Sequence, residues 1–344
     1  MIIYTCMAAA SRDEICFNRF DDQEYDAYEP FGSVAFYTHG PEPKWRAIDM
    51  GQYIVAAIAL RNNGTVTAQF ASLSAEGEFA IYSARGVEVE KIVGAGIDSE
   101  GSAGYGRLSA LRQIGHSLFA CGAGGQVYVR RPRAGWGLLS RALLTDKNMA
   151  SDYLKQVPSY GDFADKRDWE NWISSHPLPK EIHLHDVNGH DENNIYFVGE
   201  GGFIGFWNGE QLVPLASVAN HALTRILVED ERTVWICGRN GLLLRGNRHD
   251  GFAQISAAGS QAFLSMARYH GELYVASHAN PSQLFVLDRS GGGIKPVLGA
   301  PEIDGLHTLA AVDDVLWAAG VTDIVRFDGH VWDYIYVKGM REIW

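Results

Sequence analysis

The sequence predicts an all-β protein built as a single β-propeller, with seven blades expected and six as the alternative. The first observation is an internal repeat in which two apolar runs flank a glycine turn, and its clearest copies are Leu118–Val129, Ile195–Phe206 and Val234–Arg245. Looser copies begin at Leu273 and Leu316. Two apolar runs separated by such a turn are typical of a β-hairpin.

The second observation is the period of this repeat. Successive aromatic landmarks lie 39, 39 and 43 residues apart, and they are Tyr196, Trp235, Tyr274 and Trp317. A period of about 40 residues with about four strands in each unit is what a propeller blade requires. One such sheet cannot bury both of its faces, whereas radial stacking buries them between neighbouring units. Helices are disfavoured here because glycines recur and β-branched and aromatic residues dominate.

The expected elements follow the chain in order, and residues 1–344 form one domain. The first blade is expected from Met1–Met7, Glu14–Arg19, Ser33–Thr38 and Trp45–Met50, and the second from Tyr53–Leu60, Val66–Leu73, Phe79–Ser83 and Glu88–Val93. The third spans Leu108–Leu144, and the later blades have inner strands at His183–Val187, Ala222–Val228, Phe263–Arg268 and His307–Val312. Because Val331–Val337 completes the last blade as an outer strand, closure of the ring does not require a strand from the N-terminus.

An insertion of different character separates the third and fourth blades. Phe119 and Tyr196 are 77 residues apart, which we interpret as one period plus an insertion at 146–179. Within it, Phe163, Trp169 and the residues that follow have mixed spacings of three and four, which predicts a helix.

Insertions on one rim of a rigid scaffold are where binding residues collect, and tryptophan is a residue type enriched at binding hot spots. Trp169 and Trp172, with Asp165 and Asp168 beside them, are therefore candidates for partner binding. The alternative is that both tryptophans attach the helix to the propeller.

A second candidate surface is the acidic segment between Phe20 and Phe31, which holds five carboxylates and two tyrosines. Tyrosine supplies contact area at low entropic cost, and carboxylates supply charge. Tyr25, Asp26 and Tyr28 are thus candidates for docking a basic protein. A solvated acidic loop is the alternative.

Histidines mark a third candidate site on an inner strand. His183 and His185 alternate along it, so both rings point to one face, which is a geometry that metal ligands use. The alternative is that they are polar residues of the central channel, and we expect no bound metal and no cofactor. Placing the inner strands side by side brings Arg225 and His307 to the same channel mouth, where a small ligand could bind.

The acidic turn, glycine hairpin and terminal Asn-Gly of Asp186–Gly209 resemble the repeats of bacterial β-propellers of the broad seven-bladed class. That class includes photosystem II stability-factor-like, kelch-like and WD-like propellers. The resemblance covers Leu108–Trp332 well and the first hundred residues weakly. It implies the fold alone, because propellers with this fold serve many unrelated functions.

Composition narrows the function classes. The net charge of −12 argues against direct binding of nucleic acid and would suit a basic protein partner. The apolar N-terminal residues lack a positively charged segment before them, and no apolar run approaches the length of a membrane span. The four cysteines lack metal-binding spacing, and we interpret them as small buried hydrophobes. We expect a cytoplasmic protein that is monomeric on its own.

The sequence carries no Gly-x-Ser-x-Gly, Lys-Thr-Gly or His-Glu-x-x-His motif. We therefore expect a non-catalytic, protein-binding propeller that neutralises or escorts a basic partner, such as an immunity protein against a bacterial toxin or an assembly factor. The alternative is a hydrolase or lyase that acts at the channel mouth through His183, His185, Arg225 and His307.

Overall fold

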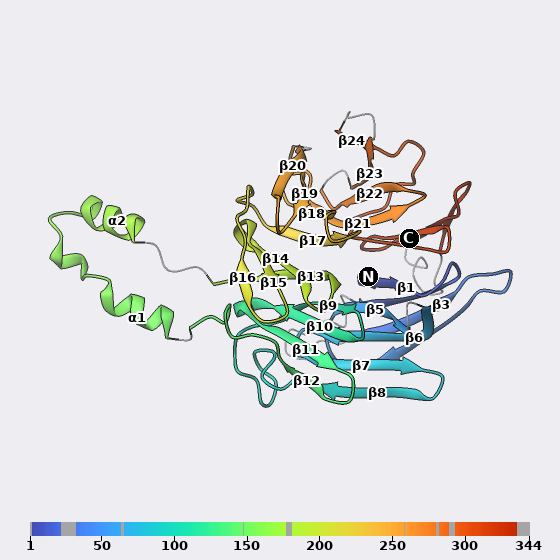
Figure 1. Cartoon of the computed structure of the whole chain (residues 1–344), viewed down its shortest axis with the longest axis horizontal. Coiled ribbons are helices and arrows are strands. Elements are labelled where there is room, and N and C mark those ends of the chain that lie inside the picture. Colours follow the sequence, from blue (N-terminus) through green and yellow to red (C-terminus); the bar gives the residue numbers. More distant parts are fainter. Residues whose placement is uncertain are drawn as a thin grey trace.

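The computed structural model describes residues 2–21, 32–62, 65–146, 148–176, 181–257, 259–279, 282–288 and 293–335. Its strands form seven four-stranded antiparallel sheets, and each sheet uses four strands that are consecutive in the chain. These sheets are the blades of a propeller arranged around a central channel (Figure 1). The prediction of an all-β propeller is confirmed, and the number of blades is seven.

The strands of the first four blades have the following bounds. Blade one contains β1 (Ile2–Ala9), β2 (Glu14–Asp21), β3 (Ser33–Thr38) and β4 (Lys44–Asp49), and blade two contains β5 (Ile54–Asn62), β6 (Thr65–Ser74), β7 (Glu78–Ser83) and β8 (Gly86–Lys91). Blade three contains β9 (Leu108–Ile114), β10 (Ser117–Gly122), β11 (Val127–Arg131) and β12 (Gly135–Leu138), and blade four contains β13 (Leu184–Asp191), β14 (Asn194–Gly199), β15 (Ile204–Trp207) and β16 (Leu212–Pro214).

The last three blades continue the pattern. Blade five contains β17 (Leu223–Val228), β18 (Val234–Gly238), β19 (Leu242–Asn247) and β20 (Gly251–Ala257), and blade six contains β21 (Phe263–Tyr269), β22 (Glu272–Ser277), β23 (Gln283–Asp288) and β24 (Gly293–Pro296). Blade seven contains β25 (Thr308–Val312), β26 (Val315–Ala319), β27 (Ile324–Phe327) and β28 (Trp332–Tyr334). The first strand of each blade lines the channel.

Steric constraints explain why glycine recurs in the turn between the second and third strands. In blades three and four it forms a short 3-10 turn, η1 (Ala123–Gly125) and η3 (Glu200–Gly202). Gly125 and Gly202 have φ values of +70° and +77°. A Cβ atom on Gly202 would lie 2.0 Å from the carbonyl oxygen of Ala219, in the connection to the next blade. Glycine is thus required both for the left-handed backbone and for the close approach of the neighbouring chain.

The hydrophobic core lies between adjacent blades. Phe119 of blade three and Phe197 of blade four are buried in one cluster, and Phe17 of blade one packs in another with Trp317 of blade seven. Trp317 is fully buried. Each blade therefore depends on its neighbours to cover both of its faces, as the radial arrangement requires.

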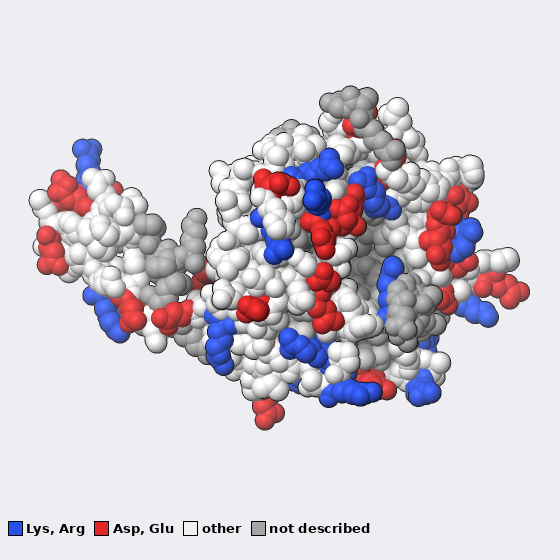
Figure 2. Space-filling view, viewed as in Figure 1, with Lys and Arg blue, Asp and Glu red and all other residues white. Residues whose placement is uncertain are grey.

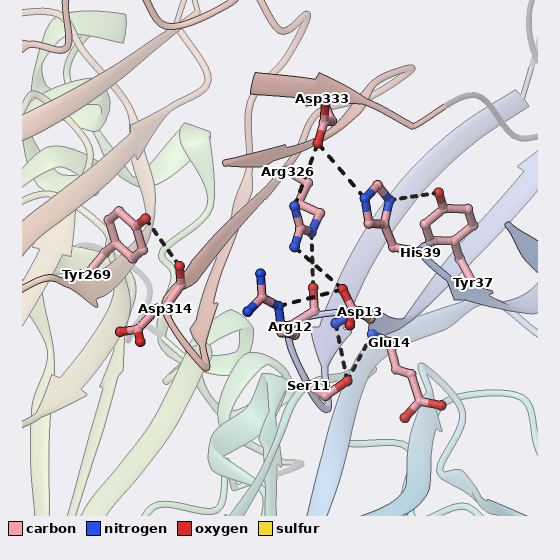
Figure 3. Close-up of polar contacts among 10 residues, drawn as sticks. All are labelled: Ser11, Arg12, Asp13, Glu14, Tyr37, His39, Tyr269, Asp314, Arg326 and Asp333. Atoms are coloured by element: carbon pink, nitrogen blue, oxygen red, sulfur yellow. Dashed lines mark hydrogen bonds and ion pairs between the residues drawn. The ribbon is translucent and has the colours of Figure 1, made fainter. Parts of the chain in front are cut away.

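Blades one and seven close the ring without exchanging a strand, because β1 is an inner strand and β28 is an outer one. The backbone N–H of Tyr4 donates to the carbonyl oxygen of Val321 at 2.9 Å. Nearer the outside, Arg326 reaches across the boundary to the carbonyl oxygen of Arg12 at 3.1 Å and to the carboxylate of Asp13 at 3.5 Å (Figure 3). This boundary is called the seam below.

The order of the strands gives the propeller two different faces. The hairpin face carries the turns between the first and second strands of each blade, and those between the third and fourth. The connection face carries the turns between the second and third strands, together with all connections from blade to blade. Residues 22–31 lie outside the described residues, but they are flanked by the ends of β2 and β3 at the connection face.

The long connection between β12 and β13 forms an arm that contains α1 (Met149–Gln156), η2 (Tyr160–Asp162) and α2 (Lys166–Ser175). Figure 1 shows that α1 and α2 project well away from the sheets. Both ends of the arm are held by η1: the N–H of Thr145 donates to the carbonyl oxygen of Gly124 at 2.9 Å, and the N–H of Gly125 donates to that of Ile182 at 2.7 Å. The arm thus leaves and re-enters the ring at one turn.

All four cysteines, Cys6, Cys16, Cys121 and Cys237, are buried and unbridged. Burial raises the pKa of Cys6 and of Cys237 to about 12. They are therefore small hydrophobic residues of the core, as expected from the sequence. Among the described residues, no helix has the length and apolar character needed to cross a bilayer.

Candidate functional site

The central channel opens at the hairpin face into a mouth of about 840 Å³, to which all seven inner strands contribute residues. Small or aliphatic side chains such as Ala57, Met266 and Ala310 keep it wide. Its charged lining residues are all cationic: they are Arg61, Arg112, Arg225 and Arg268. No carboxylate belongs to the lining among the residues that the structure describes.

A buried carboxylate links two of these arginines. Asp186, from β13, has no exposed surface, and it accepts hydrogen bonds from Nη2 of Arg112 at 3.2 Å and from the backbone N–H of Ile226 at 2.9 Å. Nη1 of Arg225 lies 3.7 Å from the other carboxylate oxygen. Three adjacent blades therefore meet at this single aspartate.

The two guanidinium groups share one negative charge, which leaves an excess of positive charge inside the channel. Burial, followed by repulsion from Arg112, lowers the pKa of Arg225 to about 10, although Asp186 opposes the shift. Arg225 is still charged at neutral pH. In addition, Nε of Arg112 is a buried donor without a hydrogen-bond partner among the described residues.

Deeper in the channel, a smaller chamber of about 190 Å³ is lined by Arg112, Arg225 and His307, among others. Nε2 of His307 lies 3.1 Å from the carbonyl oxygen of Tyr4 and 3.0 Å from that of Gly320, and Nδ1 lies 2.8 Å from the hydroxyl of Thr308. Carbonyl oxygens only accept, so Nε2 carries the proton and Nδ1 accepts from Thr308. Burial lowers the pKa of His307 to about 4, which keeps the ring neutral.

The structure brings Arg225 and His307 together in this chamber but leaves the other two predicted channel residues outside its described lining. Nε2 of His183 lies 3.2 Å from Glu181, and that of His185 lies 2.9 Å from Glu200. These pairs are partly or largely exposed at the start of β13.

One group of described residues has the spacing of cation ligands, and it includes neither His183 nor His185. His190, Asp191 and Glu231 each offer one atom, and these atoms lie within 4.8 Å of one another. Asp191, however, already accepts hydrogen bonds from the backbone N–H of Asn193 and the side chain of Asn194. The group is a surface cluster on the hairpin face.

The arm places its predicted residues around a small aromatic cluster of its own. Trp172 stacks on His176 with ring centroids 4.3 Å apart, and Trp169 meets Tyr160 edge-on at 6.1 Å. Asp165 caps α2 by accepting from the backbone N–H of Asp168 at 2.9 Å.

The hydroxyl of Tyr153, from α1, donates to the carbonyl oxygen of His176 and joins the two helices. The candidates of the acidic segment, Tyr25, Asp26 and Tyr28, lie outside the described residues.

Sequence reasoning missed Arg61, Arg112 and Arg268 as channel residues. A signal for Arg112 was available, because it is the only charged residue of its inner strand, as Arg225 is of its own. Its partnership with Asp186 depends on the register between blades, and a repeat pattern does not contain that information.

Comparison with solved structures defines the class of protein: a seven-bladed β-propeller like those of WD40 proteins and YCF48. The WD40 propeller domain of Doa1 superposes with a TM-score of 0.61 at 8% identity. The match covers 98% of this chain and 93% of the Doa1 chain. YCF48 from Cyanidioschyzon merolae has a TM-score of 0.60 at 13% identity, with 95% of both chains covered. YCF48 bound to D1 peptide has a TM-score of 0.58 at 11% identity, with 97% and 94% covered. At these identities the likeness establishes the fold alone.

Comparison of sequences gives a more particular relative. Over 151 residues the chain is 34% identical to Immune protein Tsi7 of Pseudomonas aeruginosa, and is its distant homologue. The aligned region covers 43% of this chain and 47% of that protein, so the match spans about half the length of the curated relative. No protein-family model matches the chain.

Proposed function

We propose that this chain is a non-catalytic immunity protein that neutralises a toxin protein by binding it. The observation that carries the proposal is the 34% identity to an immune protein. A rigid propeller with a projecting arm suits this role, because binding residues are commonly displayed on segments that a rigid scaffold holds.

We assign the contact with the toxin to the connection face and to the arm that leaves it. Tyr160 is 56% exposed, and Trp169 and Trp172 are only partly covered by the arm itself. Figure 2 shows acidic and basic residues together on the arm. Aromatic side chains rimmed by charge are the composition of a binding hot spot. The net charge of −12 favours a basic toxin, because opposite charge speeds association and selects partners.

The geometry of His307 supports binding rather than catalysis. Both of its ring nitrogens are hydrogen-bonded within the fold, and its lowered pKa leaves it a poor general base near neutral pH. Its contacts to Tyr4 and Gly320 instead make it a structural link across the seam.

The test begins with capture of the partner from the native cell by the tagged protein. The captured protein is then expressed in a sensitive host with and without this chain. We expect it to stop growth when expressed alone and to be harmless when this chain is present at equal or greater amount. A captured protein that is harmless alone, or that stops growth regardless of this chain, would contradict the proposal.

Variants of the arm then test the surface. Because the ends of the arm meet at η1, residues 148–178 can be replaced by a short Gly/Ser linker. We expect this deletion to abolish protection, and Trp169→Ala with Trp172→Ala to weaken the complex by about 2 kcal/mol or more. Trp45→Ala is the matched control, because Trp45 is 41% exposed on the outer strand of blade one. If Trp45→Ala weakens the complex as much as the arm variants do, the assignment of the arm to the interface is wrong.

A further inference from the structure

The channel mouth has a chemistry that the proposed toxin-binding role does not use. We propose that it is a binding site for a small organic dianion, a dicarboxylate or a phosphate monoester. This site opens on the hairpin face, whereas the arm leaves the connection face, so the inference stands independently of the proposed function.

The charge of the mouth supports a doubly negative ligand. Four arginines line it: Arg112 and Arg225 share the carboxylate of Asp186, and Arg268 pairs with Glu229. The carboxylate of Glu192 also lies behind the lining, where it accepts from the backbone N–H of His116 and, within the described part of the chain, pairs with none of the four arginines. Two guanidinium charges are therefore left without a carboxylate of their own. They occur in a chain whose net charge is −12, so this concentration of positive charge is local.

The arrangement of Arg112 and Arg225 indicates where the anion binds. Both line the mouth as well as the deeper chamber, and they share the single carboxylate of Asp186. Repulsion between the two guanidinium groups costs free energy. An anion bound beside them would relieve this repulsion and receive charge-assisted hydrogen bonds, which are about twice as strong as neutral ones.

The remaining walls favour an organic anion over a bare inorganic ion. Met7, Ile58, Met266 and Leu309 contribute apolar surface between the arginines. The volume of about 840 Å³ lies within the range of small-molecule sites. Binding pockets typically combine such apolar walls with a few convergent polar groups, and the arginines are the polar groups here.

Isothermal titration of the purified full-length protein with succinate and with phenyl phosphate tests the proposal. The ionic strength is held constant with sodium chloride, and the pH is 7.5, where a phosphate monoester is mainly dianionic. We expect saturable binding of one equivalent of at least one dianion, and none of uncharged succinamide. Absence of saturable binding by both dianions would overturn the proposal.

Three substitutions locate the site. We expect Arg225→Gln to weaken binding by about tenfold, since it removes a charge-assisted contact. Arg61→Gln should weaken it by a smaller factor, and Arg61 is exposed at the rim, so this variant remains informative if Arg225→Gln fails to fold. Arg239→Gln is the matched control, because Arg239 is exposed on the connection face of the same blade as Arg225. A loss for Arg239→Gln as large as for Arg225→Gln would show non-specific attraction and overturn the site.

Discussion

The propeller ring and the helical arm differ in where their side chains find partners: those of the ring bond across blades, and those of the arm bond within the arm. At the seam, Arg326 is only 4% exposed and bonds to groups of blade one (Figure 3). In the described part of the chain, the side chains of α2 bond only within the arm. The ring is therefore a mutually supported structure, whereas the arm has its own local stability. A change in one should leave the other intact, and the following predictions test this separation.

Among changes to polar side chains, the largest loss of stability is expected at the seam. Arg326→Met removes a buried cation from the carbonyl oxygen of Arg12 and from the carboxylates of Asp13 and Asp333, and should lower the free energy of unfolding by about 3 to 4 kcal/mol. Urea denaturation followed by tryptophan fluorescence measures it.

The control for the seam is Arg130→Met, which breaks an ion pair with Glu90 between blades two and three. The Arg130 side chain is 27% exposed whereas that of Arg326 is 5% exposed, so the loss should be about 1 kcal/mol. Equal losses for the two variants would show that the seam is no more dependent on its arginine than an ordinary blade boundary is.

The next effect is a loss of stability in acid that is traceable to His307. Its pKa is about 4 in the folded protein and about 6.5 in an unfolded chain, so the unfolded state binds the proton first as the pH falls. The contribution of His307 to the free energy of unfolding is therefore fully present above about pH 6.5. About 3 kcal/mol of it is lost as the pH drops to 4.

His307→Asn removes the titrating group while keeping a donor for the carbonyl oxygens. Its unfolding free energy, measured by denaturant titration at several pH values, should fall less steeply between pH 6.5 and 4 than that of the wild type. Parallel curves for the two proteins would contradict the assignment.

The smallest effect on the stability of the ring is expected from a change in the arm. Trp172→Ala removes the stack on His176 but no contact of the core. The free energy of unfolding of the ring should therefore change by less than about 0.5 kcal/mol. Trp317→Ala, in the fully buried core between blades seven and one, should cost about 3 to 5 kcal/mol. A loss of ring stability in the arm variant close to that of the core variant would disprove the separation of arm and ring.

The repeat predicted the ring well because each blade is a local unit. The predicted strand at Ser33–Thr38 coincides with β3, even though the early blades lack the glycine turn. The helical pattern around Trp169 and Trp172 corresponds to α2, but α1 was not predicted, since a helix of two turns carries only a weak periodic signal.

The channel site was predicted only in part. The sequence pointed to Arg225 because its inner strand could be aligned with those of the neighbouring repeats. The contact of Asp186 with Arg112 spans 74 residues of chain, and it depends on the stagger between two blades. The excess of cations over carboxylates in the mouth therefore appears only once all seven inner strands are assembled.

The attachment of the arm has a consequence for how such proteins diversify. Thr145 and Ile182 are both held by the η1 turn, so the 36 residues between them form a cassette with closely spaced ends. A cassette of another length or sequence could be grafted at the same two residues without changing the register of any blade. Under the proposed function, in which the arm contacts the toxin, a new toxin would be recognised by replacement of the cassette, while the ring that carries it is inherited unchanged.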